Sequence, residues 1–455
     1  MEHPGIGVDF GTSNTTVAVF DGKKITYLKL DNRTGRGIIM PTALYLDREC
    51  DPSVGADALV RCLEDNTGRK IILSDKDVGC VTVHMGEMDR DYFIERDRTF
   101  TTMVTGKIDS ELPGRLFRSM KSYLGDSSDH RFDVFGRKFR LEAILTIILR
   151  YVGERISAGT EVRCQNIYIG RPVLYSGTSL DPSARALERM GSICANAGLG
   201  NVEFLMEPEA AALSYLHSHD TADGENILVV DFGGGTLDLC LMARDSNRYK
   251  LKAVAGVPRA GDNIDRLIYH KMISPSLGAG LGKEEDFHFS EFEDKLLNWQ
   301  STYLLNQSSY MEQINKLIKR GGENARKARR LKKLIRLNGS FQLIELIEEA
   351  KIALSTEERT SIVMEEIDLS VPFSRIDFEK ILEPVFSDIS SVVQEVLGKA
   401  GLTSGELSRV LCTGGSSRIP AVRRHLASLL GKEPEEWDSF RGIAAGLAVA
   451  SYLDQ

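Results

Sequence analysis

The sequence predicts an α/β protein of two similar halves, each with the element order βββαβαβα, and two observations support this. A glycine-rich stretch occurs twice, as Gly5–Phe20 (GIGVDFGTSNTTVAVF) and as Asn226–Met242 (NILVVDFGGGTLDLCLM). Each copy opens a run of three short strand patterns, which helix and strand patterns then follow in alternation. Because internal repetition indicates an architecture most directly, we expect two lobes with a cleft between them.

The first half contains each element of this order. Residues 5–30 alternate apolar and polar side chains on both sides of an Asp21-Gly22 turn, which predicts a three-stranded meander. Helices are expected where apolar residues recur at helical spacing, and strands where short apolar runs end at a turn residue. The helices are predicted at 139–159, 180–198 and 209–218, and the strands between them at 166–173 and 202–205.

A polar segment from residue 35 to about residue 130 interrupts the first half. It contains two short strand candidates, ALYL at 43–46 and YFIE at 92–95. Leu116–Gly125 (LFRSMKSYLG) has helical spacing and ends in glycine, which commonly stops a helix. We therefore expect an inserted outer part that ends in a helix.

The second half repeats the order from residue 226. The patterns predict a meander over 226–256, helices at 262–273, 341–354, 378–397 and 441–453, a strand at 361–369, and a strand, turn and helix over 409–430. Residues 275–330 are polar, and we expect an irregular insertion there. Lys316–Arg336 is strongly basic, which favours a solvated helical hairpin; a patch that docks a partner is the alternative.

Composition excludes several classes of protein. The chain has 455 residues and a net charge of −8, whereas nucleic-acid and anionic-membrane binding generally require a basic field. No apolar run approaches the roughly 20 residues that span a bilayer, and the N-terminus has no secretory signal pattern. We expect a cytoplasmic protein. The seven scattered cysteines form no CxxC pair, so reduced, packed thiols are expected instead of a zinc site.

Both glycine-rich stretches place an aspartate at the end of a buried strand, Asp9 in one and Asp231 in the other. The turn that follows each aspartate consists of glycine and hydroxyl residues. Such turns present backbone N–H groups in a concave array that binds phosphate oxygens, and a strand-end carboxylate can hold a divalent cation through its water shell. Two facing turns therefore predict a site for a magnesium-bound polyphosphate.

Five motifs are similar to those of the actin-like ATPase superfamily, which has a ribonuclease H-like fold, and within it to the ATPase region of DnaK-type heat-shock proteins of seventy kilodaltons. They are VDFGTSNTTVAV, the GRP strand end, MEPEAAALSY, VVDFGGGTLDL and TGGSSRIPAV. The resemblance covers nearly the whole chain and implies two lobes, each with an inner and an outer subdomain. The expected bounds are 1–222 for lobe I (inner 1–40 and 139–222, outer 41–138) and 223–455 for lobe II (inner 223–261 and 374–455, outer 262–373).

The resemblance also implies roles for residues around the phosphates of ATP or ADP. Asp9 and Asp231 would hold Mg²⁺ through water, and Asp238 would be a further acid near the metal. Lys121 would orient the attacking water beside Glu207, unless Lys121 is an ordinary surface lysine. The phosphates would be bound by Gly11, Thr12, Ser13 and Asn14 from lobe I and by Gly233, Gly234, Gly235 and Thr236 from lobe II, with Thr236 also close to the reaction.

On the nucleoside side, the resemblance implies that two further groups of residues hold adenosine. The first is the turn with Gly414, Gly415, Ser416 and Arg418, and the second is Glu348, Lys351 and Ser355 on one helix face. The chain departs from the family pattern at Ile352, where the chaperones usually carry a second arginine that stacks on the base. The affinity or selectivity for the base is therefore expected to differ.

The function expected from the resemblance is that of a DnaK-like chaperone-family ATPase that binds ATP with Mg²⁺, hydrolyses it slowly and switches conformation with the nucleotide. Since the sequence stops at Gln455, directly after the last helix, we expect it to lack a peptide-binding domain. A protein partner of the co-chaperone or exchange-factor type is implied; the oligomeric state is left open. The alternatives are a nucleotide-sensing scaffold without turnover, a small-molecule kinase of the same superfamily, and a filament-forming protein of the actin type.

Overall fold

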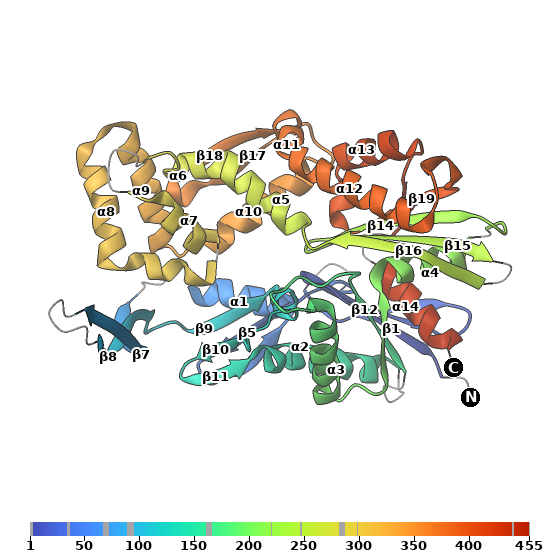
Figure 1. Cartoon of the computed structure of the whole chain (residues 1–455), viewed down its shortest axis with the longest axis horizontal. Coiled ribbons are helices and arrows are strands. Elements are labelled where there is room, and N and C mark those ends of the chain that lie inside the picture. The colour runs from blue at the N-terminus through green and yellow to red at the C-terminus, as the bar shows by residue number, and fades with distance from the viewer. Residues whose placement is uncertain are drawn as a thin grey trace.

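The computed structural model describes residues 3–33, 37–66, 72–88, 95–160, 166–219, 221–245, 248–281, 287–297, 299–438 and 441–454. Figure 1 shows two halves, with the N-terminal part of the chain below and most of the C-terminal part above. The last helix, α14 (Gly442–Leu453), returns to the lower half and lies beside β1 (Gly5–Phe10), so both termini lie at the same end.

The sheet of the first half has the order β13-β12-β1-β2-β3. Along this path lie β1, β2 (Asn14–Phe20), β3 (Ile25–Tyr27), β12 (Ile167–Arg171) and β13 (Val202–Met206), and the short β4 (Met40–Pro41) pairs with β2 as a sixth strand. β1 pairs antiparallel with β2 and parallel with β12, and the connecting helices are α2 (Leu141–Thr160) and α3 (Pro182–Ala197). The helix α4 (Glu207–Ser218) follows β13 directly, so the edge of the sheet places Glu207 at a helix start.

The sheet of the second half repeats this order as β16-β15-β14-β19-β20. Its strands are β14 (Asn226–Phe232), β15 (Leu237–Asp245), β16 (Arg248–Val257), β19 (Arg409–Thr413) and β20 (Glu435–Glu436). As in the first half, the first strand pairs antiparallel with the second and parallel with the fourth. The helices α12 (Glu383–Ala400), α13 (Pro420–Leu430) and α14 complete the unit, so the predicted α/β duplication is confirmed.

Each half carries an insertion. In the first half it contains β4 (Met40–Pro41), β5 (Ala43–Asp47), β6 (Pro52–Val54), α1 (Ala56–Asn66), β7 (Leu73–Met88), β8 (Glu95–Asp109), β9 (Gly114–Arg118), the 3₁₀ turn η1 (Met120–Tyr123), β10 (Arg131–Val134) and β11 (Arg137–Arg140). In the second half, α5 (Gly261–Ile268) and η2 (Tyr269–Ile273) lead into α6 (Ser274–Leu277), α7 (Phe289–Leu297), η3 (Trp299–Asn306), α8 (Ser308–Arg320), α9 (Gly322–Arg336), α10 (Ser340–Ala353), β17 (Arg359–Met364), η4 (Glu365–Ile367), β18 (Leu369–Ser374) and α11 (Arg375–Ile381).

Three expectations about the insertions were wrong. Leu116–Gly125 is not a helix: Leu116 and Phe117 belong to β9 and face two different hydrophobic clusters, and only the short turn η1 follows. Residues 275–330 are largely helical, since buried side chains such as Phe292 and Leu317 recur within polar sequence. The helix at 378–397 is two helices, because Pro384 starts α12. The YFIE candidate lies outside the described residues except for Glu95.

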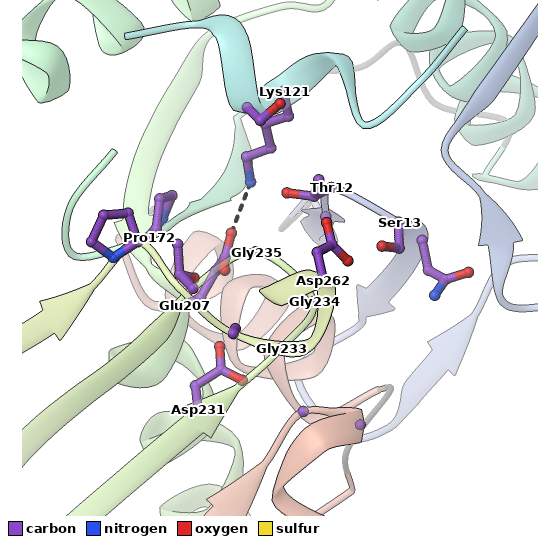
Figure 2. A pocket seen from close by; sticks show the side chains of 18 of the residues that line it. Thr12, Ser13, Lys121, Pro172, Glu207, Asp231, Gly233, Gly234, Gly235 and Asp262 are labelled. Carbon is purple, nitrogen blue, oxygen red and sulfur yellow. Dashed lines mark hydrogen bonds and ion pairs between the residues drawn. The ribbon is translucent and has the colours of Figure 1, made fainter. Parts of the chain in front are cut away.

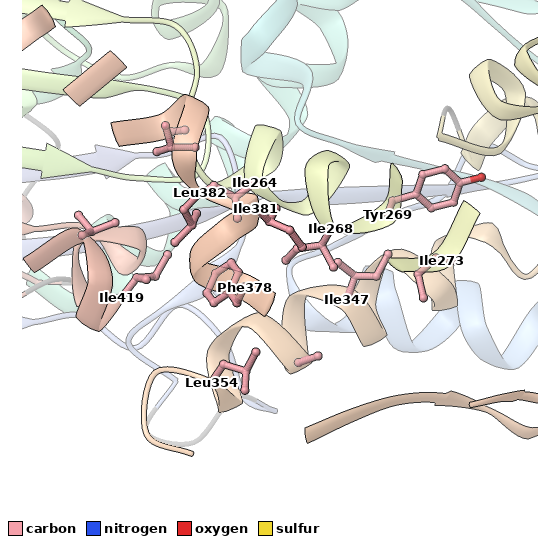
Figure 3. Packing of buried hydrophobic residues seen from close by; sticks show 14 of the residues in the cluster. Ile264, Ile268, Tyr269, Ile273, Ile347, Leu354, Phe378, Ile381, Leu382 and Ile419 are labelled. Carbon is pink, nitrogen blue, oxygen red and sulfur yellow. The ribbon is translucent and has the colours of Figure 1, made fainter. Parts of the chain in front are cut away.

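Close backbone contacts and a continuous core fix the helices against the sheets. A Cβ on Gly7 would lie 2.2 Å from the carbonyl oxygen of Ala444, so only glycine lets α14 approach β1 this closely. In the second half, Ile264 and Ile268 of α5 pack with Ile347 and Phe378 in the main core (Figure 3). This packing holds α5 beside the cleft. Within the described residues, no helix is both long and apolar enough to cross a bilayer.

Candidate functional site

A cleft of about 580 Å³ lies between the two halves, within the size range of small-molecule sites. Both repeated turns line it, one with Thr12 and Ser13 and the other with Gly233, Gly234 and Gly235 (Figure 2). The cleft residues are Asp9, Gly11, Thr12, Ser13, Asn14, Thr16, Ile39, Lys121, Ser122, Pro172, Tyr175, Ser176, Glu207, Asp231, Gly233, Gly234, Gly235, Thr236, Pro258, Arg259, Ala260, Asp262, Asn263, Arg266, Gly414, Gly415 and Ile443. The structure therefore brings most of the predicted phosphate-side residues together.

The two turns have the same backbone closure. The N–H of Gly11 donates to the carbonyl of Asn14 at 2.9 Å, and the N–H of Gly233 donates to the carbonyl of Thr236 at 3.1 Å. In each turn, the sequence Asp-Phe-Gly joins the first strand to the second. The shared geometry follows from the shared sequence.

The turns also meet across the cleft. A Cβ built on Gly234 would lie 3.0 Å from Oγ of Ser13, and one on Gly235 would lie 3.2 Å from Oγ1 of Thr12. A side chain at either glycine would fill the space where the two turns face each other. A Cβ at Gly234 or Gly235 would force the hydroxyl of the facing turn to shift, so glycine at these positions keeps the gap between the lobes open.

Neighbouring elements hold the second turn in place. At the start of α5, the N–H of Asp262 donates to the carbonyl of Gly234 at 2.8 Å, and the N–H of Gly261 donates to the carbonyl of Gly233 at 3.1 Å. The hydroxyl of Ser416 donates to the same Gly233 carbonyl at 2.9 Å. Ser416 is thus a support of the turn, and it is not among the cleft residues.

Asp9 and Asp231 are each the next-to-last residue of the first strand of their sheet, and both line the same cleft. Burial and the charge of Glu207 raise the pKa of Asp9 to about 7. The pKa of Asp231, which is 5% exposed, is raised by burial and by the neighbouring carboxylates Glu207, Asp238 and Asp9. Carboxylates that repel each other in a shared, poorly hydrated space bind a cation readily.

Asp238 was predicted as a further acid near the metal, and the structure places it behind the turn. It sits opposite Asp231 on β15, is 1% exposed and is not among the cleft residues. The N–H of Val173, which follows Pro172, donates to its carboxylate at 3.1 Å. Burial raises the pKa of Asp238 to about 7, although a hydrogen bond from Thr236 opposes the shift.

Lys121 is the buried cation of the site. It is 5% exposed, so it is not a surface lysine; Nζ donates to Oε1 of Glu207 at 2.9 Å and to the carbonyl of Phe10 at 2.6 Å (Figure 2). Burial is the largest single effect and would lower its pKa, but the charges of Glu207, Tyr175 and Asp9 and the hydrogen bond to Glu207 together raise the pKa. Both side chains line the cleft, Lys121 from η1 and Glu207 from the first residue of α4.

Only some of the residues that were predicted to hold the nucleoside line the cleft. Gly414 and Gly415 line it, and Gly414 has a φ of +81° with its Cβ position 2.4 Å from the Phe232 carbonyl oxygen. Arg418 instead forms an ion pair with Glu436 at 3.1 Å. Glu348 lines a neighbouring cavity of about 290 Å³ that shares Ser13, Asp262 and Arg266 with the cleft.

The remaining part of the predicted adenosine face points elsewhere. Nζ of Lys351 lies 2.8 Å from the carboxylate of Asp265, so this lysine already has an ion-pair partner. Ser355 lies after the end of α10 and is not among the cleft residues. Ile352, the predicted departure on this helix, is 61% exposed. No residue of the α10 group therefore lines the cleft.

Two basic side chains in the cleft were missed by sequence reasoning. Arg259 and Arg266 lie just before and within α5, and Arg266 lines both cavities. Their place in the cleft depends on how α5 packs against the rest of the second half. A sequence motif therefore does not reveal it. Their charge is suited to an anionic ligand.

Contacts between the lobes close the outer edge of the neighbouring cavity. Phe341 of α10 is 8% exposed and packs among Ala43, Tyr45, Ala58 and Leu116 of the first half. Beside it, Arg118 of β9 forms an ion pair with Glu345 at 3.2 Å and lies 5.5 Å from the centre of the Phe341 ring. The packing of Phe341 and the Arg118–Glu345 ion pair thus join the two insertions.

The repeated sheets and the shared cleft define the class of the protein as a two-lobed, actin-like ATPase fold. A family model described as Hsp70 protein matches residues 5–275 and 328–452. The chain belongs to the Hsp70 family. It is 27% identical to the chaperone protein DnaK of Deinococcus proteolyticus over 342 residues, which are 73% of this chain and 45% of that protein.

Other relatives match more of the chain. The chaperone protein DnaK of Thermus thermophilus is 23% identical over 439 residues, 94% of this chain and 57% of that protein. The chaperone protein DnaK of Emiliania huxleyi is 24% identical over 444 residues, 95% of this chain and 57% of that protein. The chain spans about half the length of the curated relatives it matches.

Proposed function

We propose that this protein binds ATP or ADP together with Mg²⁺ in the cleft, hydrolyses ATP slowly, and uses the nucleotide to switch between closed and open arrangements of its lobes. The observation that carries the proposal is the pair of matching Asp-Phe-Gly turns, whose aspartates Asp9 and Asp231 enter one cleft from opposite halves. Membership of the Hsp70 family supports the nucleotide.

The residues present fit a magnesium-bound polyphosphate. The bare turns leave space that a Cβ at Gly234 or Gly235 would fill, and the backbone N–H groups of such turns suit phosphate oxygens. Asp9, Asp231 and Glu207 would repel a phosphate chain in the absence of a cation. Among the described residues, no group of three His, Cys, Asp or Glu side chains forms a protein cage for a metal. Magnesium usually needs only one or two carboxylates together with phosphates and water.

Bound Mg²⁺ would neutralise charge that develops on the phosphates during transfer. The chain's own part in catalysis is mainly positioning, as phosphoryl transfer requires. Asp9 and Asp231 would hold the metal's water shell, with Asp238 supporting the turn behind them. Gly11, Thr12, Ser13 and Asn14 would face the phosphates from one side, and Gly233, Gly234, Gly235 and Thr236 from the other.

Lys121 and Glu207 are positioned to act on the attacking water. Their ion pair sits at the wall of the cleft, and both side chains are nearly shielded from solvent. Lys121 would orient the water, with the carboxylate of Glu207 beside it, and the ammonium group would also stabilise negative charge at the terminal phosphate. The bond that Lys121 makes to Phe10 fixes the ammonium group next to the first turn.

On the nucleoside side, we propose that Gly414 and Gly415 back the sugar. Ser416 supports the second turn, while Arg418, Glu348, Lys351 and Ser355 stay predictions of nucleoside contact, since they do not line the cleft in this structure. Arg259 and Arg266 are the cleft arginines that can approach the base or a phosphate.

We further propose the lobe bounds 1–222 and 223–455 with their inner and outer parts, a cytoplasmic location, and a protein partner of the co-chaperone or exchange-factor type.

The test of the ATPase proposal is phosphate release by the wild type, Asp9→Asn and Lys121→Ala. The control is Lys138→Ala, at an exposed lysine outside the cleft. We expect Asp9→Asn and Lys121→Ala to lose turnover and Lys138→Ala to retain it. Equal rates in all four proteins would overturn the ATPase proposal.

A nucleotide sensor without turnover is the second candidate, and one observation favours it. Lys121 is already bound to both Glu207 and the Phe10 carbonyl, which leaves fewer donors for a reacting phosphate. Calorimetry separates the two functions: tight ATP binding by a wild type that releases no phosphate supports the sensor.

A further inference from the structure

The α8–α9 hairpin, residues 308–336, concentrates positive charge on an acidic protein. It contains ten Lys and Arg residues and two Glu residues, a net charge of +8, whereas the whole chain has −8 and the remaining residues therefore −16. The hairpin lies in the second half at the end of the molecule remote from the termini (Figure 1). The fold of the nucleotide cleft does not explain this charge, since no hairpin residue lines the cleft.

Part of this hairpin also lies outside the match to the family model. The Hsp70 family model matches residues 5–275 and resumes at 328, so α8 and the first turns of α9 fall in the unmatched segment. The hairpin is nevertheless well packed, because Ile314, Leu317, Ala325, Ala328 and Leu331 are all buried. The hairpin is therefore a well-packed element with a strongly charged exterior.

The exposed basic side chains form a continuous stripe. Arg326, Arg329, Lys333 and Arg336 follow each other at intervals of three and four residues on the solvent face of α9, opposite its buried residues. At 1.5 Å per residue, the stripe is about 15 Å long. Lys316 and Lys319 extend the basic surface onto the neighbouring α8.

Most of these charges have no ion-pair partner among the residues that the structure describes. Lys333 forms an ion pair with Asp368 at 2.8 Å and Arg326 lies 3.8 Å from Glu323, but Lys316, Lys319, Arg329 and Arg336 have no ion pair with any residue that the structure describes. Like charges three and four residues apart destabilise a helix, and an anionic partner would remove that cost. Burial, together with the positive field of Arg336, lowers the pKa of Lys332.

We propose that the stripe on α9, with Lys316 and Lys319, docks an acidic segment of a partner protein. Carboxylates are the favoured anions because the stripe already binds one: Lys333 holds the Asp368 carboxylate and Arg330 donates to the Asp368 carbonyl at 3.0 Å. A narrow acidic segment contacts only the hairpin, whereas a duplex or a membrane surface would bring its phosphates against the acidic remainder of the chain. The proposal is independent of nucleotide hydrolysis.

The test is the binding of a fluorescein-labelled peptide rich in Glu and Asp, followed by anisotropy at low and moderate salt. The stripe variant combines Lys316→Glu, Lys319→Glu, Arg329→Glu and Arg336→Glu. The control variant makes the same change in net charge at Lys23, Lys24, Arg137 and Lys138, which lie in the first half. Circular dichroism and thermal unfolding check that both variants fold.

We expect the stripe variant to bind the peptide about tenfold more weakly than the control variant, since each exposed pair contributes little and four act together. We also expect the affinity of the wild type to fall with salt. Equal peptide affinity in the two variants, or no measurable binding of the peptide by the wild type, would overturn the proposal. So would tighter binding of a single-stranded or duplex oligonucleotide of matched charge at the same salt, which would assign the stripe to nucleic acid.

Discussion

Replacing Lys121 by methionine removes the positive charge from a buried group of acids. The lysine is 5% exposed and its partner Glu207 9% exposed, with Nζ and Oε1 2.9 Å apart. Without the lysine, Glu207 would remain as an uncompensated charge beside Asp9 and Asp231. Breaking a buried pair by removing one partner typically costs about 3–5 kcal/mol. We expect a loss of this size in the free energy of unfolding of Lys121→Met, measured in urea with chelator and without nucleotide.

The double variant Lys121→Met/Glu207→Gln distinguishes this cause from lost packing. Because it removes both charges, we expect it to recover about half of the loss or more, giving a coupling energy of about 2 kcal/mol. The control Lys138→Met, at an exposed position, should change the free energy by less than about 0.5 kcal/mol. A loss below about 1 kcal/mol for Lys121→Met, or a double variant as unstable as the single one, would refute the reasoning.

Three further predictions concern other parts of the site. Gly234→Ala places a Cβ 3.0 Å from Oγ of Ser13 and should weaken nucleotide binding about tenfold in calorimetry. The control Gly398→Ala, whose Cβ meets nothing within 4 Å, should leave the affinity unchanged. Equal affinities of the two variants would contradict the tight approach of the turns. Burial raises the pKa of Asp265 to about 6, so the folded protein keeps this proton at a pH where the unfolded chain has lost it. Between about pH 4 and pH 6, the wild type should therefore lose stability with rising pH, relative to Asp265→Asn, by up to about 1.4 kcal/mol per pH unit. Parallel stability curves for the two proteins would contradict this. Phe341→Ala should lower the melting temperature and speed nucleotide release, since truncating a buried Phe costs about 3–5 kcal/mol and its pocket belongs to the other lobe. The control is Ile376→Ala, at a side chain that is 68% exposed.

The parts of the fold that the sequence predicts correctly are those specified by local chemistry. The helix α3 begins after Asp181, whose side chain accepts from the N–H of Ala184, and ends at Gly198 with a φ of +77°, as these residue types indicate. The doubled turns could be predicted because Asp-Phe-Gly occurs at the same place in both meanders. In these segments, the local preference and the tertiary structure agree.

The segments that could not be predicted depend on contacts made far along the chain. Local patterns do not place Lys121, which lies in a short turn after a strand; only the family resemblance predicted its position beside Glu207, 86 residues away. The helical spacing of Leu116–Gly125 is overridden because Leu116 and Phe117 face opposite clusters across a sheet. Likewise, Lys351 is held by Asp265 of α5, and only the tertiary structure brings these two residues together.

The most direct test of the central claim is titration of the protein with ATP by calorimetry, with and without Mg²⁺, in the wild type and in the double variant Asp9→Asn/Asp231→Asn. If the two strand-end aspartates hold the metal between the lobes, Mg²⁺ should strengthen binding in the wild type by about tenfold or more and should have almost no effect in the double variant. An equal gain from Mg²⁺ in both proteins would show that the paired turns do not form a metal-dependent nucleotide site.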